Sequence, residues 1–91
     1  MYIIVTRHKG MIEWLEQQGI KGKVISHVSD ISDIAYQTVV GNLPLELASH
    51  CQSIITVSMP KLKPEQRGID LTPEQMNEAG AHLEEYIVKK V

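Results

Sequence analysis

The sequence predicts a three-layer α/β domain with a mostly parallel sheet. Short apolar segments rich in β-branched residues alternate with segments of helical periodicity, which is the pattern of repeated strand and helix units. The strand-like segments carry apolar residues at consecutive positions, as expected of strands buried on both faces of a parallel sheet. Because a chain of 91 residues has room for one core, we expect a single domain over residues 1–91.

The first predicted unit covers the N-terminal third of the chain. Residues 2–6 form an apolar, β-branched run that predicts a buried strand. Residues 10–18 carry apolar side chains at helical spacing, and Gly19 supplies a stop signal, so a helix is predicted there. Residues 23–28 predict the second strand, and a polar turn rich in serine and aspartate follows over residues 29–33.

A second unit of strand, turn and helix follows the first. Residues 36–40 predict a third strand, which a Gly-Asn pair ends. Residues 43–51 place apolar side chains on one helical face, with Pro44 suited to a first-turn position, so this segment predicts a second helix. Residues 53–59 are nearly all apolar and predict a fourth strand.

The C-terminal third is predicted to be a surface loop followed by a long helix. Residues 60–70 combine prolines and a glycine with charged side chains, which indicates a loop. Thr72 and Gln75 have the spacing of a capping box, with Pro73 at the first helical position. Apolar or small residues then recur at helical spacing towards the C-terminus, namely Met76, Ala79 or Gly80, Leu83 and Ile87. The helix is therefore predicted to continue to the C-terminus.

Composition and charge exclude several classes of protein. A hydrophobic share of 43% and a charged share of 22% exclude a disordered or collagen-like chain. A formal net charge of −2 argues against a duplex DNA partner. No apolar run is long enough to span a membrane, and the N-terminus lacks a signal-peptide pattern. The single cysteine, Cys51, excludes an intrachain disulfide and fits a reducing compartment, so we expect a cytoplasmic protein.

The four histidines do not form a metal-binding pattern. None of His8, His27, His50 and His82 lies three or four residues from another, and a single cysteine cannot form a Cys-based zinc site. The sequence therefore predicts no metal and no cofactor.

The turn after the first predicted strand concentrates polar and charged groups, from Thr6 to Gly10. It precedes a predicted helix, whose N-terminal N–H groups attract anions, and Gly10 permits close approach of a phosphate. Arg7 can bind a phosphate bidentately, Lys9 adds a point charge and His8 can transfer a proton near neutral pH. The spacing alone is equally compatible with a solvated turn of ordinary surface charges.

Two further loops carry groups that could join this turn. Gly41, Asn42 and Leu43 follow the third predicted strand and could present amides to a base, ribose or phosphate, although a helix cap at Asn42 explains the same residues. Arg67 belongs to the basic loop over residues 60–70, which could close over an anion or remain solvated. Because ligands in open α/β sheets bind at the carboxyl ends of strands, all three turns are expected to converge on one site.

These residues carry two resemblances to known families. Thr6-Arg7-His8 is similar to the Arg-His-Gly motif of histidine phosphatases, but Lys9 interrupts the motif and the chain is too short for that family's second arginine and histidine. A longer resemblance rests on three segments: Val5-Thr6-Arg7-His8 with Gly10 and Trp14-Leu15, then Val40-Gly41-Asn42-Leu43-Pro44, and finally Arg67-Gly68 with Leu71-Thr72. Together they resemble a family of small CRISPR-associated accessory proteins from type III systems.

The longer resemblance implies a homodimer with a Rossmann-like fold. Members of this family and its functional relatives are ring nucleases, which cut cyclic oligoadenylates, chiefly cyclic tetra-adenylate, and so switch off a second-messenger response. The implied chemistry is metal-independent: a ribose 2′-OH attacks its own phosphodiester and leaves a linear product with a 2′,3′-cyclic phosphate.

The resemblance points to these positions, and the implied chemistry suits the residues of the polar turns. Arg7, His8 and Thr6 are the candidate catalytic residues. The candidate ligand-binding residues are Lys9, Gly10, Gly41, Asn42, Leu43 and Arg67. Two other functions stay open: a module that sequesters cyclic oligoadenylates without cutting them, and a small CRISPR interaction protein whose basic turn contacts protein or RNA.

Overall fold

A five-stranded sheet with the strand order β2-β1-β3-β4-β5 forms the centre of the computed structural model, which describes residues 2–91. Strands β1 (Tyr2–Val5), β2 (Gly22–Ile25), β3 (Thr38–Val40) and β4 (Ser53–Ser58) are parallel to one another. Strand β5 (His82–Tyr86) pairs antiparallel with β4 at the edge of the sheet. The predicted α/β fold with a mostly parallel sheet is confirmed.

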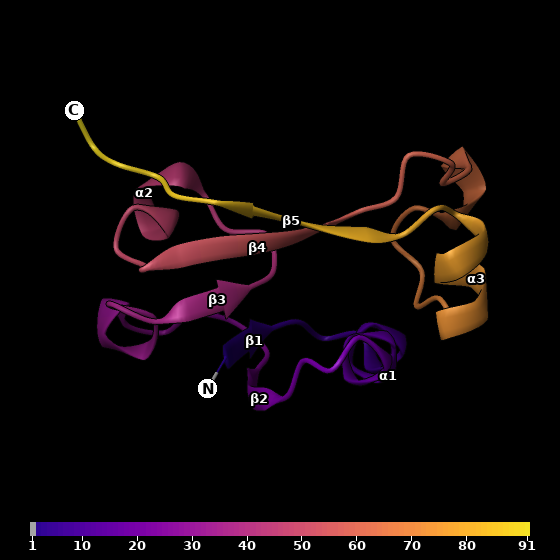
Figure 1. The fold of residues 1–91 in the computed structure, drawn as a ribbon, viewed down its shortest axis with the longest axis horizontal. Coiled ribbons are helices and arrows are strands. Elements are labelled where there is room, and N and C mark those ends of the chain that lie inside the picture. The colour runs from indigo at the N-terminus through magenta and orange to yellow at the C-terminus, as the bar shows by residue number, and fades with distance from the viewer. Residues whose placement is uncertain (1) are drawn as a thin grey trace.

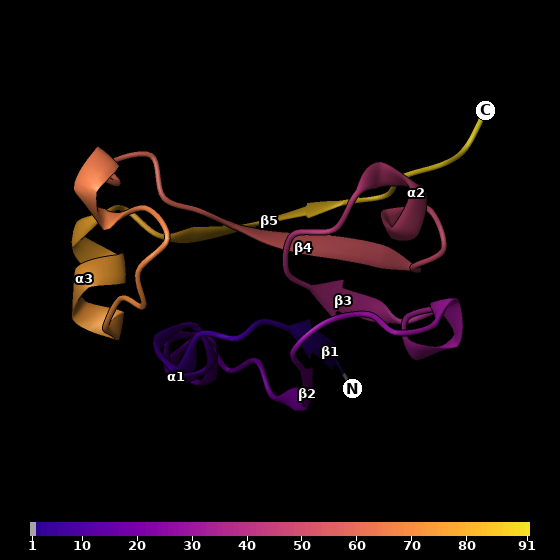
Figure 2. The same cartoon turned by 180° about the vertical axis from the view of Figure 1, so that it is seen from behind.

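Short helices connect the strands. The longest is α1 (Lys9–Gln17), and α2 (Leu45–Ala48) and α3 (Pro73–Glu78) are shorter, with 3₁₀ turns at Ile31–Asp33 and Pro64–Gln66. Figures 1 and 2 show α1 and α3 side by side at one end of the view, with α2 at the opposite end. No helix within residues 2–91 is long and apolar enough to cross a membrane.

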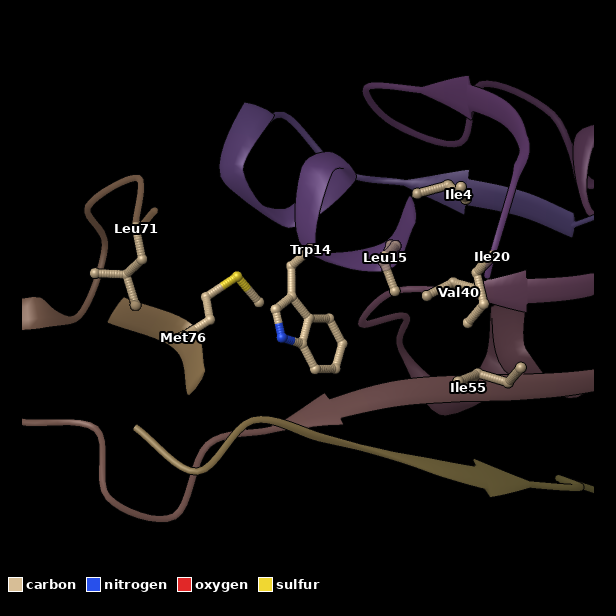
Figure 3. Packing of buried hydrophobic residues seen from close by; sticks show 8 residues of the cluster. All are labelled: Ile4, Trp14, Leu15, Ile20, Val40, Ile55, Leu71 and Met76. Carbon is tan, nitrogen blue, oxygen red and sulfur yellow. The ribbon is translucent and has the colours of Figure 1, made fainter. Parts of the chain in front are cut away.

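Alternation along the strands divides the core into two layers. Ile4, Val40 and Ile55 face α1 and α3, where they form one cluster with Trp14 and Leu15 (Figure 3). The preceding residue of each strand faces the other side of the sheet, and these residues, Ile3, Val39 and Ile54, pack with Ile34, Ala48 and Cys51. Because successive strand residues point to opposite faces, an all-apolar strand fills both layers. The three-layer prediction is therefore confirmed.

Trp14 connects α1 to α3 by packing and by a hydrogen bond. Its indole is 2% exposed, and its Nε1–H donates a 2.8 Å hydrogen bond to Oδ1 of Asn77. Figure 3 shows the thioether of Met76 directed towards the same indole, a favourable contact between sulfur and an aromatic ring. The two helices thus form one layer although they are distant in the sequence.

The prediction that the last helix continues to the C-terminus is wrong. The capping box at Thr72 and Gln75 is present, with both reciprocal hydrogen bonds, but the helix ends at Glu78. Gly80 has φ +79°, and the N–H of Ala81 donates to the carbonyl of Met76, which is the geometry of a Schellman motif. The chain then continues as β5, which pairs antiparallel with the edge of β4.

Three smaller predictions also differ from the structure. Tyr36 is not in the third strand, because it has φ +61° and precedes β3 by two residues. The second helix is a single turn rather than residues 43–51, and Pro44 occupies its N-cap position. His27 lies beyond the end of β2, where its ring nitrogens face the hydroxyls of Ser26 and Ser29.

The strand order places a topological switch point between β1 and β3. The connection from β1 to β2 runs through α1 on one face of the sheet, whereas the connection from β3 to β4 runs through α2 on the other face. The chain therefore leaves the carboxyl ends of β1 and β3 in opposite directions and opens a crevice between them.

Candidate functional site

A cavity of about 320 Å³ lies at the carboxyl ends of β1 and β3, at the switch point. Thr6, Arg7 and His8 line it from the turn after β1, and Gly41 and Asn42 line it from the turn after β3. Ser26, Met59 and apolar side chains of the strands and of α1 form the rest of its wall. The structure therefore brings together two of the three turns that the sequence analysis expected to converge.

The turn after β1 holds its polar groups in a defined local structure. The N–H of His8 donates a 3.1 Å hydrogen bond to Oγ1 of Thr6, which closes a short turn at the end of the strand. His8 then occupies the N-cap position of α1 but makes no side-chain capping hydrogen bond, so its imidazole is available to the cavity. Arg7 and His8 are exposed, and Thr6 is half-buried.

Gly41 lets the end of β3 lie against β1. It has φ +145°, and a Cβ there would be 2.7 Å from the carbonyl oxygen of Val5. Its N–H donates to the carbonyl of Ile55 over 2.9 Å, so this amide belongs to the fold and is not free for a ligand. Gly41 contributes to the cavity by allowing the two chain segments to lie close together, which places Asn42 beside the turn after β1.

The helix-cap interpretation of Asn42 is wrong. The N-cap of α2 is Pro44, and no side chain caps that helix. Asn42 is exposed and lines the cavity instead. Leu43, which was predicted beside it as a ligand-binding residue, lies differently: its side chain packs against the core layer on the α2 face of the sheet.

The group that lies close to the backbone of Gly10 is another part of the chain. A Cβ at Gly10 would lie 1.6 Å from the carbonyl oxygen of Leu71, and the N–H of Gly10 donates a 3.1 Å hydrogen bond to Oδ1 of Asp70. A carboxylate of the protein thus stands at the N-terminus of α1, where the sequence predicted a phosphate. Lys9 is exposed and lines no part of the cavity.

Asp70 is the residue that the sequence analysis missed. Its Oδ1 lies 4.0 Å from Nδ1 of His8, and about half of each side chain is exposed, at 48% and 49%. Asp70 lies 60 residues from Gly10 in the sequence. The only local feature that could have pointed to it is its position two residues before the capping box at Thr72. This contact holds residues 60–71, the predicted loop with Leu71, against the start of α1, next to the predicted catalytic residues.

The 60–71 segment encloses a second cavity of about 250 Å³ beside the first. His8, Met11, Asn42 and Met59 line both cavities, so the two are adjacent. Arg67, the predicted cationic cover, is exposed and lines neither of them. The loop therefore joins the site through its backbone, through Asp70 and through its apolar residues.

Cys51 and Glu85 line neither of the two cavities. Burial raises the pKa of the Cys51 thiol, whose Sγ–H faces the carbonyl of Leu47 at 3.7 Å, so this cysteine is a core residue with little thiolate at neutral pH. Ser53 donates a 2.6 Å hydrogen bond to Oε2 of Glu85 between β4 and β5. Residues 2–91 contain no group of three His, Cys, Asp or Glu side chains arranged to hold a metal ion.

Comparison with known proteins gives one match. Residues 3–89 match the family model described as "Putative CRISPR-associated protein (Cas_VVA1548)". No curated protein and no solved structure matches the chain.

Proposed function

The chain belongs to this CRISPR-associated family, and from that premise we propose that it is a ring nuclease that cleaves cyclic tetra-adenylate. In the proposed reaction a ribose 2′-oxygen attacks the adjacent phosphorus, the bond from phosphorus to the 5′-oxygen breaks, and a 2′,3′-cyclic phosphate forms. The 2′-hydroxyl loses its proton to a base, and the leaving 5′-oxygen takes up a proton. No metal is needed, because the nucleophile belongs to the substrate.

The observation that carries the proposal is the meeting of Arg7, His8 and Asn42 at one cavity. A guanidinium, an imidazole and a carboxamide from two strand ends provide charge stabilisation, proton transfer and orientation within a single crevice. The cavity lies at the switch point, which is where open α/β sheets bind ligands. The resemblance of the three sequence segments to type III accessory proteins supports the same substrate.

Each lining residue has a role that its position supports. Arg7 would hold the scissile phosphate and offset the charge that grows on it. His8 would accept the 2′-proton or protonate the 5′-oxygen. Thr6 and Asn42 would orient the ribose, although the hydroxyl of Thr6 already accepts the N–H of His8.

The remaining predicted site residues contribute less directly. The N–H groups of Gly10 and Gly41 are both engaged in hydrogen bonds of the fold. Lys9 and Arg67 lie outside the cavity walls, so their part in binding would be a longer-range attraction for phosphates, which salt weakens.

The size of the site favours a homodimer. A cavity of about 320 Å³ is at the lower end of the volumes that hold one drug-sized ligand, and a ring of four nucleotides is considerably larger. A two-fold axis through a dimer would present each turn twice to a ring that itself has two-fold symmetry. We therefore propose that two copies share one ring.

A sequestering module is the second candidate function. Among the described residues 2–91, Arg7 and His8 are the only charged or titratable side chains in the wall of the first cavity. A phosphate held by Arg7 would be bound equally well whether or not a proton is then transferred. Binding without turnover would use the same contacts.

The deciding experiment incubates purified protein with cyclic tetra-adenylate in excess EDTA and separates the products by chromatography. We expect linear di-adenylate or tetra-adenylate that ends in a 2′,3′-cyclic phosphate. Intact ring after hours at micromolar enzyme would contradict the catalytic proposal, and stoichiometric protection of the ring without turnover would select the sequestering module.

Two variants locate the chemistry within the site. Arg7→Ala should weaken binding and lower the rate together, each by about tenfold or more, because it removes a charged phosphate contact from both the ground state and the transition state. His8→Ala should lower turnover far more than affinity. Lys23→Ala, which removes an exposed cation of β2 outside both cavities, is the matched control and should change neither.

A further inference from the structure

The second cavity is built from thioether and aliphatic side chains. Met11, Met59 and Met76 line it, which are three of the four methionines of a chain that contains no phenylalanine. Three aliphatic side chains line it as well, namely Leu62, Ile69 and Leu71. Leu71 and Met76 are buried in the core, and Met11, Met59 and Leu62 are half-buried, so the floor of this cavity is rigid and its rim is adaptable.

Polar groups stand at the edge of this apolar cavity. Asp70, Gln66 and Asn42 all line it. The Oε1 of Gln66 accepts the N–H of Lys63, which leaves the amide NH₂ as a free donor. The Oδ1 of Asp70 accepts the N–H of Gly10, which leaves the second carboxylate oxygen as a free acceptor. The edge therefore offers a donor and an acceptor around an apolar slot.

The two cavities suit two parts of one ligand. His8, Asn42, Met11 and Met59 line both cavities and lie on their common boundary. Arg7 lines only the first cavity, and Met76 lines only the second. A volume of about 250 Å³ is below the range for a drug-sized ligand and suits a single planar group. A phosphate held by Arg7 would place the attached base next to the methionines.

We infer that the cavity lined by Met11, Met59 and Met76 is the subsite for one adenine base of the ring. This inference rests on the proposed function. Thioethers pack favourably on aromatic rings, so the methionines would contact the faces of the base. The polar side chains that line the cavity would form hydrogen bonds with the edge of the base. The free carboxylate oxygen of Asp70 would accept from the 6-amino group of adenine, whereas the 6-oxo group of hypoxanthine would face the carboxylate unfavourably.

The test observes the methionine methyl groups directly by NMR. Protein labelled with ¹³C at the methionine methyls is titrated with cyclic tetra-adenylate, with adenosine 5′-monophosphate, with inosine 5′-monophosphate and with inorganic phosphate. We expect both adenine compounds to shift the signals of Met11, Met59 and Met76 through the ring current of the base. The shift at Met76 places the base in the second cavity, because Met76 does not line the first. Inosine 5′-monophosphate should bind at least about tenfold more weakly than its adenine counterpart, and inorganic phosphate should leave the methyl signals in place.

A matched pair of variants supplies an independent readout. Ile69→Ala shortens an exposed side chain of the cavity wall, and Ile31→Ala makes the same change at a similarly exposed residue that lines neither cavity. We expect Ile69→Ala to weaken binding of adenosine 5′-monophosphate by about threefold to tenfold and Ile31→Ala to leave it unchanged.

The outcomes separate the subsite from the function. If cyclic tetra-adenylate is bound or cut while the methyl signals stay in place, the subsite is wrong and the proposed function stands. If cyclic tetra-adenylate does not bind at all, the proposed function fails, and the mononucleotides decide the subsite by themselves. Methyl shifts with the adenine mononucleotide alone would then support a base site, and unchanged signals would overturn it.

Discussion

At Gly10 the close approach that the sequence predicted is made by another part of the chain. The sequence predicted that an anion approaches the backbone at Gly10, and the structure places an anion there, but the anion is the carboxylate of Asp70. The carboxylate of Asp70 therefore accepts a hydrogen bond at this helix terminus. A carboxylate satisfies the free N–H of the first turn as a phosphate would, and it also lies 4.0 Å from His8.

Asp70 should stabilise the fold measurably through this contact. We expect Asp70→Ala to lower the free energy of unfolding by about 1 kcal/mol, because the Gly10 N–H loses its acceptor at a helix N-terminus. Asp70→Asn keeps an oxygen acceptor and should lose less than half as much. Urea denaturation followed by circular dichroism measures both.

The control for Asp70 is another carboxylate of the same loop. Glu65 is exposed and lines neither cavity, so Glu65→Ala should stay within about 0.5 kcal/mol of the parent protein. Equal losses for Glu65→Ala and Asp70→Ala would contradict a specific role for Asp70.

At the scale of elements, α3 and β5 show the limit of periodicity. Met76, Leu83 and Ile87 fit a helical repeat, yet only Met76 lies in a helix. A spacing of three to four residues is a weak signal in a segment with few apolar residues, and the capping box at Thr72 marks where a helix begins but not where it ends. The stop signal was Gly80, which the sequence analysis counted as a helical position.

The substitution Gly80→Ala distinguishes the observed end of α3 from the predicted continuous helix, because it should change the stability in opposite directions in the two cases. In the structure Gly80 has φ +79°, so an added Cβ should cost about 1 kcal/mol of stability. In a continuous helix the same change would increase stability by about 1 kcal/mol, because alanine has the higher helix propensity. Thermal and urea unfolding give the sign, with Glu78→Ala at an exposed position of α3 as the control. A more stable Gly80→Ala protein would contradict the end of α3 and the strand that follows it.

At the scale of the whole molecule, the topology decides which turns meet. The strand order puts β1 beside β3, so the turns that begin at Thr6 and Gly41 share a crevice although they are distant in sequence. The third predicted turn, in the 60–70 loop, reaches the site through Asp70 and the methionine cavity rather than through Arg67. The convergence was predicted for the right physical reason, since parallel strands end at one edge of the sheet.

The stoichiometry of binding tests the proposed shared site. If two chains hold one ring, calorimetry should give one cyclic tetra-adenylate for every two chains, and sedimentation should give twice the chain mass with and without the ring. One ring bound to each chain, by a species with the mass of a single chain, would contradict the shared site while leaving the cavity itself in place.

The sequence by itself determined the features that depend on neighbouring residues. These are the strands that are apolar on both faces, the capping box at Thr72 and the polar turn from Thr6 to His8, because each follows from local backbone preferences and side-chain patterns. The family resemblance added the function that we propose.

Only the tertiary structure decided which distant residues meet. Trp14 and Asn77 are 63 residues apart and Gly10 and Asp70 are 60 apart, and no local pattern predicts either pair. Strand β5 likewise forms because β4 offers an open edge with which it pairs. Such contacts depend on how the layers pack, and packing is a property of the whole chain rather than of any segment of it.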